Sequence, residues 1–159
     1  MIRAAILTVS DSASAGTRAD TSGPGLAARI AELGWSVAAT SLVPDDMREI
    51  AVKLSEWSDA GLGLILTTGG TGVATRDITP EATRMVIERE IPGMAELIRM
   101  RGMEQTKLSV LSRGLVGQRK QSLIVNLPGS PRGALFSLQV IEHLIPHVVD
   151  LLQGRTEHV

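Results

Sequence analysis

The chain has 159 residues, the size of one ordinary domain, and we expect a single domain over residues 1–159. Its 16 basic and 17 acidic residues give a formal net charge of −1, so no overall field favours nucleic acid or an anionic membrane. Cysteine and tyrosine are absent, and the aromatic residues are Trp35, Trp57 and Phe136. This composition excludes disulfides, thiolate chemistry and the aromatic platforms of proteins that bind single-stranded nucleic acids.

We also expect a cytoplasmic protein that contacts neither nucleic acid nor a membrane. No stretch approaches the roughly 20 apolar residues that a membrane-spanning helix needs. The N-terminus opens on a strand-like segment and lacks the pattern of a secretory signal. A chain without cysteine also suits a reducing compartment.

The first half of the chain alternates between predicted strands and predicted helices. Residues 3–9 are predicted to form a strand, residues 10–16 a small polar loop, and residues 35–43 a second strand. The helix between the two strands has apolar residues at helical spacing, namely Leu26, Ala27, Ile30 and Leu33. Gly34 stands where a left-handed residue commonly ends a helix.

The alternation continues through a third strand. Asp46 and Glu49 predict a capping box for a helix whose apolar stripe contains Ile50, Leu54 and Trp57. Residues 64–66 are short and wholly apolar, as is typical of a strand buried on both faces of a parallel sheet. This order predicts an α/β fold in which helices cover both faces of a mainly parallel sheet.

The second half begins with a long helical region over residues 80–105, interrupted by the proline and glycine at 92–93. Residues 121–127 are predicted to form another buried strand. Ser130 and Pro131 are suited to cap and start the helices that follow. The inward residues of these helices are predicted to be Leu135, Leu138, Ile141 and Leu144. The methionines of the second half, Met85, Met94, Met100 and Met103, are interpreted as filling for the core or a subunit interface.

A glycine-rich segment follows the strand at 64–66. Residues 67–72 read TTGGTG, and residues 76–81 read RDITPE, in which Thr79 is predicted to cap a helix and Pro80 to be its first residue. In open α/β sheets, anions bind at the carboxyl ends of strands, where backbone amides and helix N-termini are exposed. The segment is not a Walker A loop, because no Lys-Ser or Lys-Thr follows the glycines. It favours phosphate binding, with a plain strand-to-helix turn as the alternative.

Several other short motifs accompany this segment, in a particular order. They are TVSD at 8–11, VPD at 43–45, LSR at 111–113 and NLPGSP at 126–131. Together they resemble the MogA/MoaB family of molybdenum cofactor biosynthesis proteins, over nearly the whole chain. The resemblance implies a three-layer α/β/α sandwich that assembles as a homotrimer, with a hexamer as an alternative. It implies transfer of AMP from ATP to the terminal phosphate of molybdopterin, with release of pyrophosphate.

The resemblance also implies roles for individual residues. The catalytic residues, which also hold Mg²⁺ directly or through water, are Asp45 and Asp77. The nucleotide-binding residues are Ser10, Asp11, Gly69, Gly70, Thr71 and Gly72. The residues that bind the pterin or its phosphate are Ser12, Arg113, Gly129 and Ser130. Simpler structural roles stay open, because Asp45 and Ser130 suit helix caps and Asp77 suits a turn.

The implied reaction requires neutralisation of phosphate charge and does not require a general base. The attacking phosphate is already anionic at neutral pH, so the protein must hold two phosphates in line and offset their charge. Arg113, Arg119 and Lys120 are candidate cationic partners for these phosphates.

Two other functions are considered beside adenylyl transfer. One is a MoaB-type protein that binds the pterin without adenylylating it, although an aspartate at position 77 favours the catalytic branch. The other is insertion of molybdate, which similar domains perform in chains with additional domains. A molybdenum insertase is therefore also a possible partner of this chain.

Overall fold

A computed structural model describes residues 1–157, and its single sheet has six strands in the order β2-β1-β3-β6-β5-β4. The strands are β1 (Arg3–Val9), β2 (Ser36–Val43), β3 (Leu64–Thr68), β4 (Arg89–Glu90), β5 (Val116–Arg119) and β6 (Ser122–Leu127). The helices are α1 (Asp11–Ser14), α2 (Ser22–Glu32), α3 (Met47–Asp59), α4 (Thr79–Val86), α5 (Pro92–Gly102), α6 (Pro131–Ile141) and α7 (Ile145–Leu152), with a 3₁₀ turn η1 (Lys107–Leu111).

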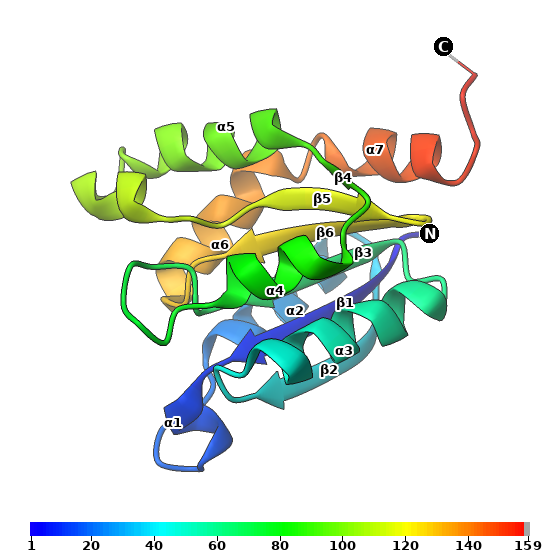
Figure 1. Ribbon diagram of the computed structural model, residues 1–159. Coiled ribbons are helices and arrows are strands. Elements are labelled where there is room, and N and C mark those ends of the chain that lie inside the picture. The colour runs from blue at the N-terminus through cyan, green and yellow to red at the C-terminus, as the bar shows by residue number, and fades with distance from the viewer. Residues whose placement is uncertain (158–159) are drawn as a thin grey trace.

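The sheet is mainly parallel, as predicted. Strands β2, β1, β3 and β6 run in the same direction, whereas β5 pairs antiparallel with β6 and β4 pairs antiparallel with β5. The carboxyl ends of the four parallel strands therefore lie at one edge of the sheet, at the left of Figure 1. The loops that follow these four strands carry the predicted site residues.

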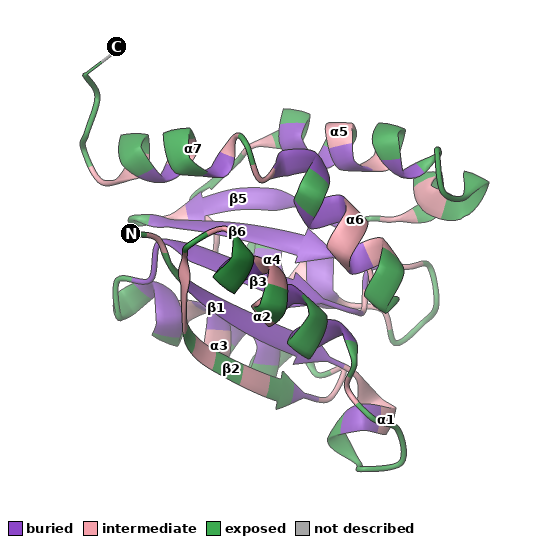
Figure 2. Ribbon diagram, turned by 180° about the vertical axis from the view of Figure 1, so that it is seen from behind, coloured by how far each residue is buried: buried purple, intermediate pink, exposed green. Residues whose placement is uncertain are grey.

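Helices cover both faces of the sheet, which gives the predicted three-layer α/β/α sandwich. Figure 1 shows α3 and α4 in front of the sheet, and α2 and α6 behind it. Strand β1 alternates between the two layers, because Ile6 packs with α2 and α6 while Leu7 packs with α3 and α4. Figure 2 shows the central strands buried and the edge strand β2 only partly covered.

Two segments differ from the sequence-based expectation. The predicted loop at 10–16 contains the short helix α1, because the Ser10 hydroxyl accepts a hydrogen bond from the amide of Ala13. The helical region at 80–105 is not one interrupted helix. Helix α4 ends at Val86, the chain then crosses β4, and α5 begins at Pro92.

Strand β5 was absent from the sequence-based prediction. Its sequence, VGQR, has no apolar alternation and contains a glycine and two polar residues. A side chain at Gly117 would meet the Ile87 side chain at 2.8 Å, so the glycine makes room for the segment that leads into β4. Gln118 is buried there because its side-chain amide donates to the Lys120 carbonyl and its oxygen accepts from Arg89. These partners are invisible in the local sequence.

Most of the predicted helix boundaries are confirmed. Asp46 accepts from the amide of Glu49 at 2.9 Å, Ser130 accepts from Gly133 at 3.1 Å, and Gly34 has a φ of +78°. The prediction for Thr79 is wrong, because it is the first residue of α4 and its buried hydroxyl donates to the carbonyl of Gly69. Thr79 thus fastens the glycine segment to the helix instead of capping that helix.

The four methionines of the second half differ in how far they are exposed to solvent. Met94 is buried in the core, while Met85, Met100 and Met103 are exposed. No single helix of residues 1–157 is long and apolar enough to cross a membrane, and α6 with α7 reaches that length only as a pair bent by 67°.

Candidate active site

The candidate active site begins at the turn between β3 and α4. Gly69 and Gly70 have φ values of +106° and +67°, in the left-handed region that glycine adopts without strain. A side chain at Gly69 would collide with the carbonyl oxygen of Val9, so β1 and this turn are in backbone contact. The loop after β6 is also close to this turn, since a Cβ on Gly129 would lie 3.3 Å from the Cα of Gly69.

The glycines also leave room for two carboxylates. A Cβ on Gly70 would lie 3.0 Å from Asp45 Oδ1 and would collide with the hydroxyl of Thr79. A Cβ on Gly72 would lie 2.8 Å from Asp77 Oδ2. Glycine at 70 and 72 therefore allows Asp45 and Asp77 to stand against the turn.

Asp45 and Asp11 hold the loops after β2 and β1 together. The amide of Asp11 donates to Asp45 Oδ2 at 3.1 Å, and the amide of Asp45 donates to Asp11 Oδ1 at 3.0 Å. Arg76 completes this cluster, because its Nε donates to Asp11 Oδ2 at 2.5 Å and its Nη2 donates to the Asp45 carbonyl at 3.1 Å. Three loops far apart in the sequence are thus joined at one edge of the sheet.

The electrostatics of this cluster differ between its two carboxylates. Burial raises the pKa of Asp45, and the nearby charges of Asp11 and Asp77 raise that pKa further. The hydrogen-bonded Arg76 guanidinium lowers the pKa of Asp11. An additional cation nearby would therefore stabilise the charged form of Asp45 more than that of Asp11, because Asp11 is already paired with Arg76.

Asp77 occupies the turn that leads into α4. Its Oδ2 accepts from the amide of Ala74 at 3.0 Å, so the turn interpretation is correct for one carboxylate oxygen. Within residues 1–157, Oδ1 of Asp77 and Oδ1 of Asp45 accept no hydrogen bond, and both residues line the same cavity. Mg²⁺ is commonly held by one or two carboxylates together with substrate phosphates. The donor set fits this ion.

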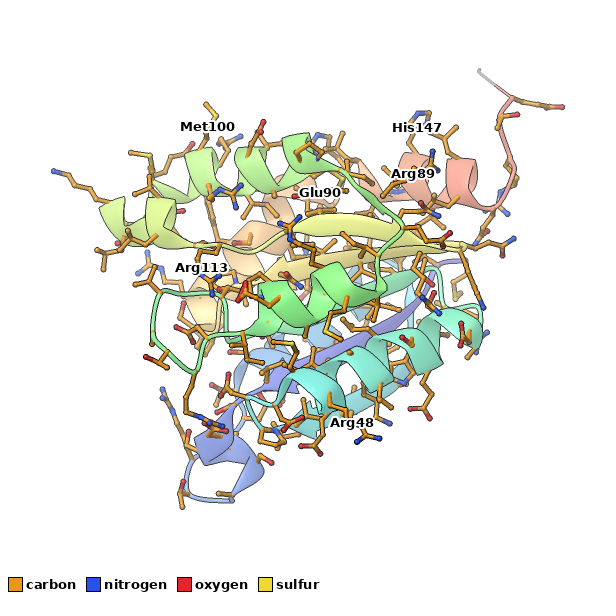
Figure 3. The ribbon with its side chains drawn as sticks, viewed as in Figure 1. Arg48, Arg89, Glu90, Met100, Arg113 and His147 are labelled. Atoms are coloured by element: carbon orange, nitrogen blue, oxygen red, sulfur yellow. The ribbon has the colours of Figure 1, made fainter. Side chains whose placement is uncertain are left out.

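Arg113 is hydrogen-bonded to the segment that carries Asp77. Its amide donates to the Thr71 carbonyl at 2.8 Å, its Nε to the Gly72 carbonyl at 2.7 Å and its Nη2 to the Asp77 carbonyl at 2.6 Å. Its Nη1 lies 2.8 and 3.0 Å from the two carboxylate oxygens of Glu81, and this ion pair lowers the pKa of Glu81. Figure 3 shows Arg113 beside the start of α4.

Two cavities flank the glycine turn. The polar cavity, of about 330 Å³, reaches from the turn to the loop before α2 and is lined by Ser10, Arg18, Asp20, Ser22, Asp45 and Gly69 among others. The apolar cavity, of about 490 Å³, lies on the other side and is lined by Val73, Ile98, Leu108, Leu111 and Phe136 among others. Both include Gly70, Asp77, Gly129 and Ser130, so these residues form a shared ridge between the cavities.

The chain is similar to known proteins over most of its length. Residues 5–147 match the family described as "Probable molybdopterin binding domain". The chain belongs to this family. It is 38% identical to the molybdopterin adenylyltransferase of Helicobacter pylori strain J99, over 96% of this chain and 89% of that protein. It is 42% identical to the Drosophila melanogaster molybdenum cofactor synthesis protein cinnamon, over 92% of this chain but only 25% of that protein.

Solved structures of the family have the same fold. The molybdopterin biosynthesis enzyme MoaB of Thermus thermophilus has a TM-score of 0.92 and 48% identity, and it covers 97% of this chain and 98% of its own. The predicted family and fold are confirmed by these similarities, as is the prediction of an enzyme of the molybdopterin adenylyltransferase class. The chain therefore functions in molybdenum cofactor biosynthesis.

Within this family fold, most of the predicted site residues meet at the carboxyl edge of the sheet. The predicted residues that line the polar cavity are Ser10, Asp45, Gly69, Gly70, Asp77, Gly129 and Ser130. Thr71 and Gly72 line the apolar cavity instead. Asp11 and Ser12 line neither cavity. Asp11 is paired with Arg76, and the Ser12 hydroxyl lies 3.3 Å from that of Ser10.

Two of the three predicted cationic partners lie away from the site. Arg119 and Lys120 stand at the turn between β5 and β6, at the opposite edge of the sheet, where both contact Asp59. Arg119 also donates to the Val86 carbonyl. Their interpretation as phosphate partners is wrong. The turn lies at the start of β6, whereas the candidate site lies at the carboxyl end of that strand, so the whole length of β6 separates the two.

Sequence reasoning missed several residues that build the site. Glu81 lies four residues after Asp77 and differs little from other surface charges until its partner Arg113 is known. Phe136 and Leu108, which line the apolar cavity, received no role from the sequence pattern. Arg18 lies in a loop without any motif. Only the arginine directly before Asp77 offered a local signal for its role.

Proposed function

We propose that the chain transfers AMP from ATP to the terminal phosphate of molybdopterin and releases pyrophosphate, with Mg²⁺ held by Asp45 and Asp77. The observation that carries this proposal is that Asp45 and Asp77 both line the polar cavity, and that the Oδ1 atom of each accepts no hydrogen bond within residues 1–157. Relatives of similar length named molybdopterin adenylyltransferase support it.

The cavities suit the parts of the two substrates. The apolar cavity, with its aliphatic side chains and the ring of Phe136, suits a planar heterocycle. The polar cavity suits phosphates, and the shared ridge of Gly70, Asp77, Gly129 and Ser130 is where the reacting phosphates would meet. Bound there, Mg²⁺ would offset the charge that develops on the departing pyrophosphate.

The protein's own contribution is alignment. Gly69 and Gly70 bring backbone close to the phosphates, and Asp77 is held by its bond from Ala74. Asp45 is fixed by its reciprocal bonds with Asp11. No group on the protein needs to remove a proton, because the attacking phosphate is already an anion at neutral pH. Positioning and charge compensation therefore supply the catalysis.

A second candidate is a pterin-binding protein that does not adenylylate. It is favoured by the 48% identity to a structure named MoaB. The test is pyrophosphate release by the purified protein with ATP, Mg²⁺ and molybdopterin. Adenylyl transfer predicts one pyrophosphate for each molybdopterin consumed. Binding of molybdopterin without pyrophosphate release would contradict adenylyl transfer and support the second candidate.

We further propose a cytoplasmic homotrimer, or a hexamer made of two trimers, that passes its product to a molybdenum insertase. The exposed Met100, Met103 and Leu108 support a subunit contact. The longer relatives, such as the Drosophila protein of which this chain spans a quarter, support a partner with further domains. Light scattering gives the mass in solution, and a monomer at micromolar concentration would contradict the assembly.

A further inference from the structure

Arg18 differs from Arg76 and Arg113, the two arginines that are bonded to the glycine turn and its loops. Arg76 is paired with Asp11, and Arg113 is paired with Glu81. Arg18 is exposed, and within residues 1–157 its side chain makes no hydrogen bond or ion pair. Among the described residues that line either cavity, it is the only one with a basic side chain.

The polar cavity has two chemically different sets of lining residues. From the loops after β2 and β3 come Asp45 and Asp77, each with one oxygen that accepts no hydrogen bond within residues 1–157. From the loop before α2 come Arg18 and Asp20, whose carboxylate accepts from the Thr8 hydroxyl at 2.9 Å and from the Gly23 amide at 3.0 Å. These two bonds orient Asp20, and no ion pair joins it to Arg18 within the described residues.

Hydrogen bonds join the loops that line this cavity. The Ser22 hydroxyl donates to the Gly129 carbonyl at 2.7 Å and joins the start of α2 to the loop after β6. The Thr68 hydroxyl donates to the Pro128 carbonyl, also at 2.7 Å. A ligand in this cavity therefore meets both the two carboxylates and a guanidinium that has no partner within residues 1–157.

We propose that Arg18 binds the β- and γ-phosphates of the nucleotide and holds the pyrophosphate as it leaves. This inference rests on the proposed function. In that reaction, an oxygen of the molybdopterin phosphate forms a bond to the α-phosphorus of ATP. The bond from the α-phosphorus to the oxygen bridging to the β-phosphorus breaks, and its electron pair leaves with pyrophosphate. A guanidinium offers the planar donor fork that suits phosphate oxygens.

The test is calorimetric titration of the full chain with ATP, pyrophosphate and AMP in the presence of Mg²⁺. Arg18→Gln is expected to weaken ATP and pyrophosphate binding by about 10- to 100-fold, as for a lost charge-assisted hydrogen bond, and to leave AMP binding unchanged. Arg18→Lys keeps the charge without the fork and should lie between the two. Because Arg18 is exposed and unpaired, neither variant should change the thermal unfolding midpoint.

The matched control is Arg48→Gln. Arg48 is an exposed arginine that points to solvent from α3 and lines neither cavity (Figure 3). Its replacement by glutamine changes the net charge by the same amount as Arg18→Gln. Its ATP binding should equal that of the wild type. A comparable loss in Arg48→Gln would overturn the proposal, since it would show an effect of net charge and not of position.

The outcomes separate this inference from the proposed function. Unchanged ATP binding by Arg18→Gln, with a wild type that binds ATP and releases pyrophosphate, overturns the role of Arg18 alone. A loss of molybdopterin binding without a loss of ATP binding overturns it in favour of the pterin phosphate. Weakened ATP and pyrophosphate binding supports Arg18 even where the wild type releases no pyrophosphate, and that second result overturns only the proposed function.

Discussion

The two cavities share one ridge but are built by different forces. The polar cavity is set by hydrogen bonds and charges, such as the reciprocal pair of Asp45 and Asp11. The apolar cavity is set by packing, and some of its lining is well exposed, with Val73 and Leu108 each 70% accessible. A cavity built from charge positions reacting groups, whereas one built from exposed aliphatic side chains gains binding energy by being covered. Substitutions on the two sides should therefore affect turnover and affinity differently.

The largest effect is expected at the ridge, for Asp77→Asn. The amide oxygen of asparagine can still accept from Ala74, so the turn survives while the charge is lost. Turnover of pyrophosphate release should fall by about 100- to 1000-fold, similar to the loss of a single electrostatic group in other active sites. Steady-state kinetics measure it, with thermal unfolding as the control for folding. Turnover within threefold of wild type would contradict a catalytic Asp77.

Gly69→Ala tests the backbone contact on which both cavities depend. The new Cβ would collide with the Val9 carbonyl at a left-handed φ, so the free energy of unfolding should fall by about 2–3 kcal/mol. The control is Gly25→Ala in α2, where a Cβ meets nothing within 4 Å and helix propensity should raise stability by about 0.5–1 kcal/mol. Urea denaturation measures both, and equal effects would contradict the collision.

Arg113→Gln tests whether Arg113 positions the loop or binds a phosphate directly. Loss of its bonds to Gly72 and Asp77 should misplace the Asp77 carboxylate and lower turnover by about 10- to 100-fold. Glu81→Gln keeps those two bonds and should lower turnover by only a few-fold, since the exposed ion pair is weak.

The kinetic constants separate the two roles of Arg113. A positioning role changes kcat, whereas a phosphate ligand changes KM. If Arg113→Gln raised KM with kcat unchanged, or if Glu81→Gln lowered KM by freeing the guanidinium, Arg113 would be a direct phosphate ligand as its sequence context predicted.

The apolar side should respond through affinity. Val73→Ser removes part of an exposed aliphatic wall, so the KM for one substrate should rise by about 2- to 5-fold with kcat unchanged. Val52→Ser is the matched control, because Val52 is also exposed but lies on α3, outside both cavities. A fall in kcat for Val73→Ser would show that the cavities do not differ in the proposed way.

The smallest effect is expected from the exposed pair of Arg76 and Asp11, and it depends on pH. Arg76 lowers the pKa of Asp11 below its ordinary value of 3.8, so the pair stabilises the native state at neutral pH. That stabilisation is lost as the pH falls through the lowered pKa. Arg76→Gln should therefore be slightly less stable than wild type at neutral pH, with a difference that shrinks below 3.8. Urea unfolding across this range measures it, and a difference independent of pH would contradict the assignment.

The parts of the site that could be predicted are those specified by residues close together in the sequence. The glycine turn, the cap at Ser130 and the nearness of Asp45 to Asp77 were predictable, because strand ends of a parallel sheet share one edge. The antiparallel extension through β5 and β4 was not, because those strands are short and polar. The burial of β5 comes from neighbours that a local pattern does not contain.

The sequence by itself determined the parallel strands, most of the helices and the loops that carry the chemistry, because apolar periodicity and turn residues act over a few positions. Only the tertiary structure decided which cations are available to a substrate. Arg76 reaches a carboxylate 65 positions away and Arg113 one 32 positions away, while Arg18 reaches none within the described residues. Ion-pair partners depend on strand order and register, which bring distant loops to the same edge of the sheet.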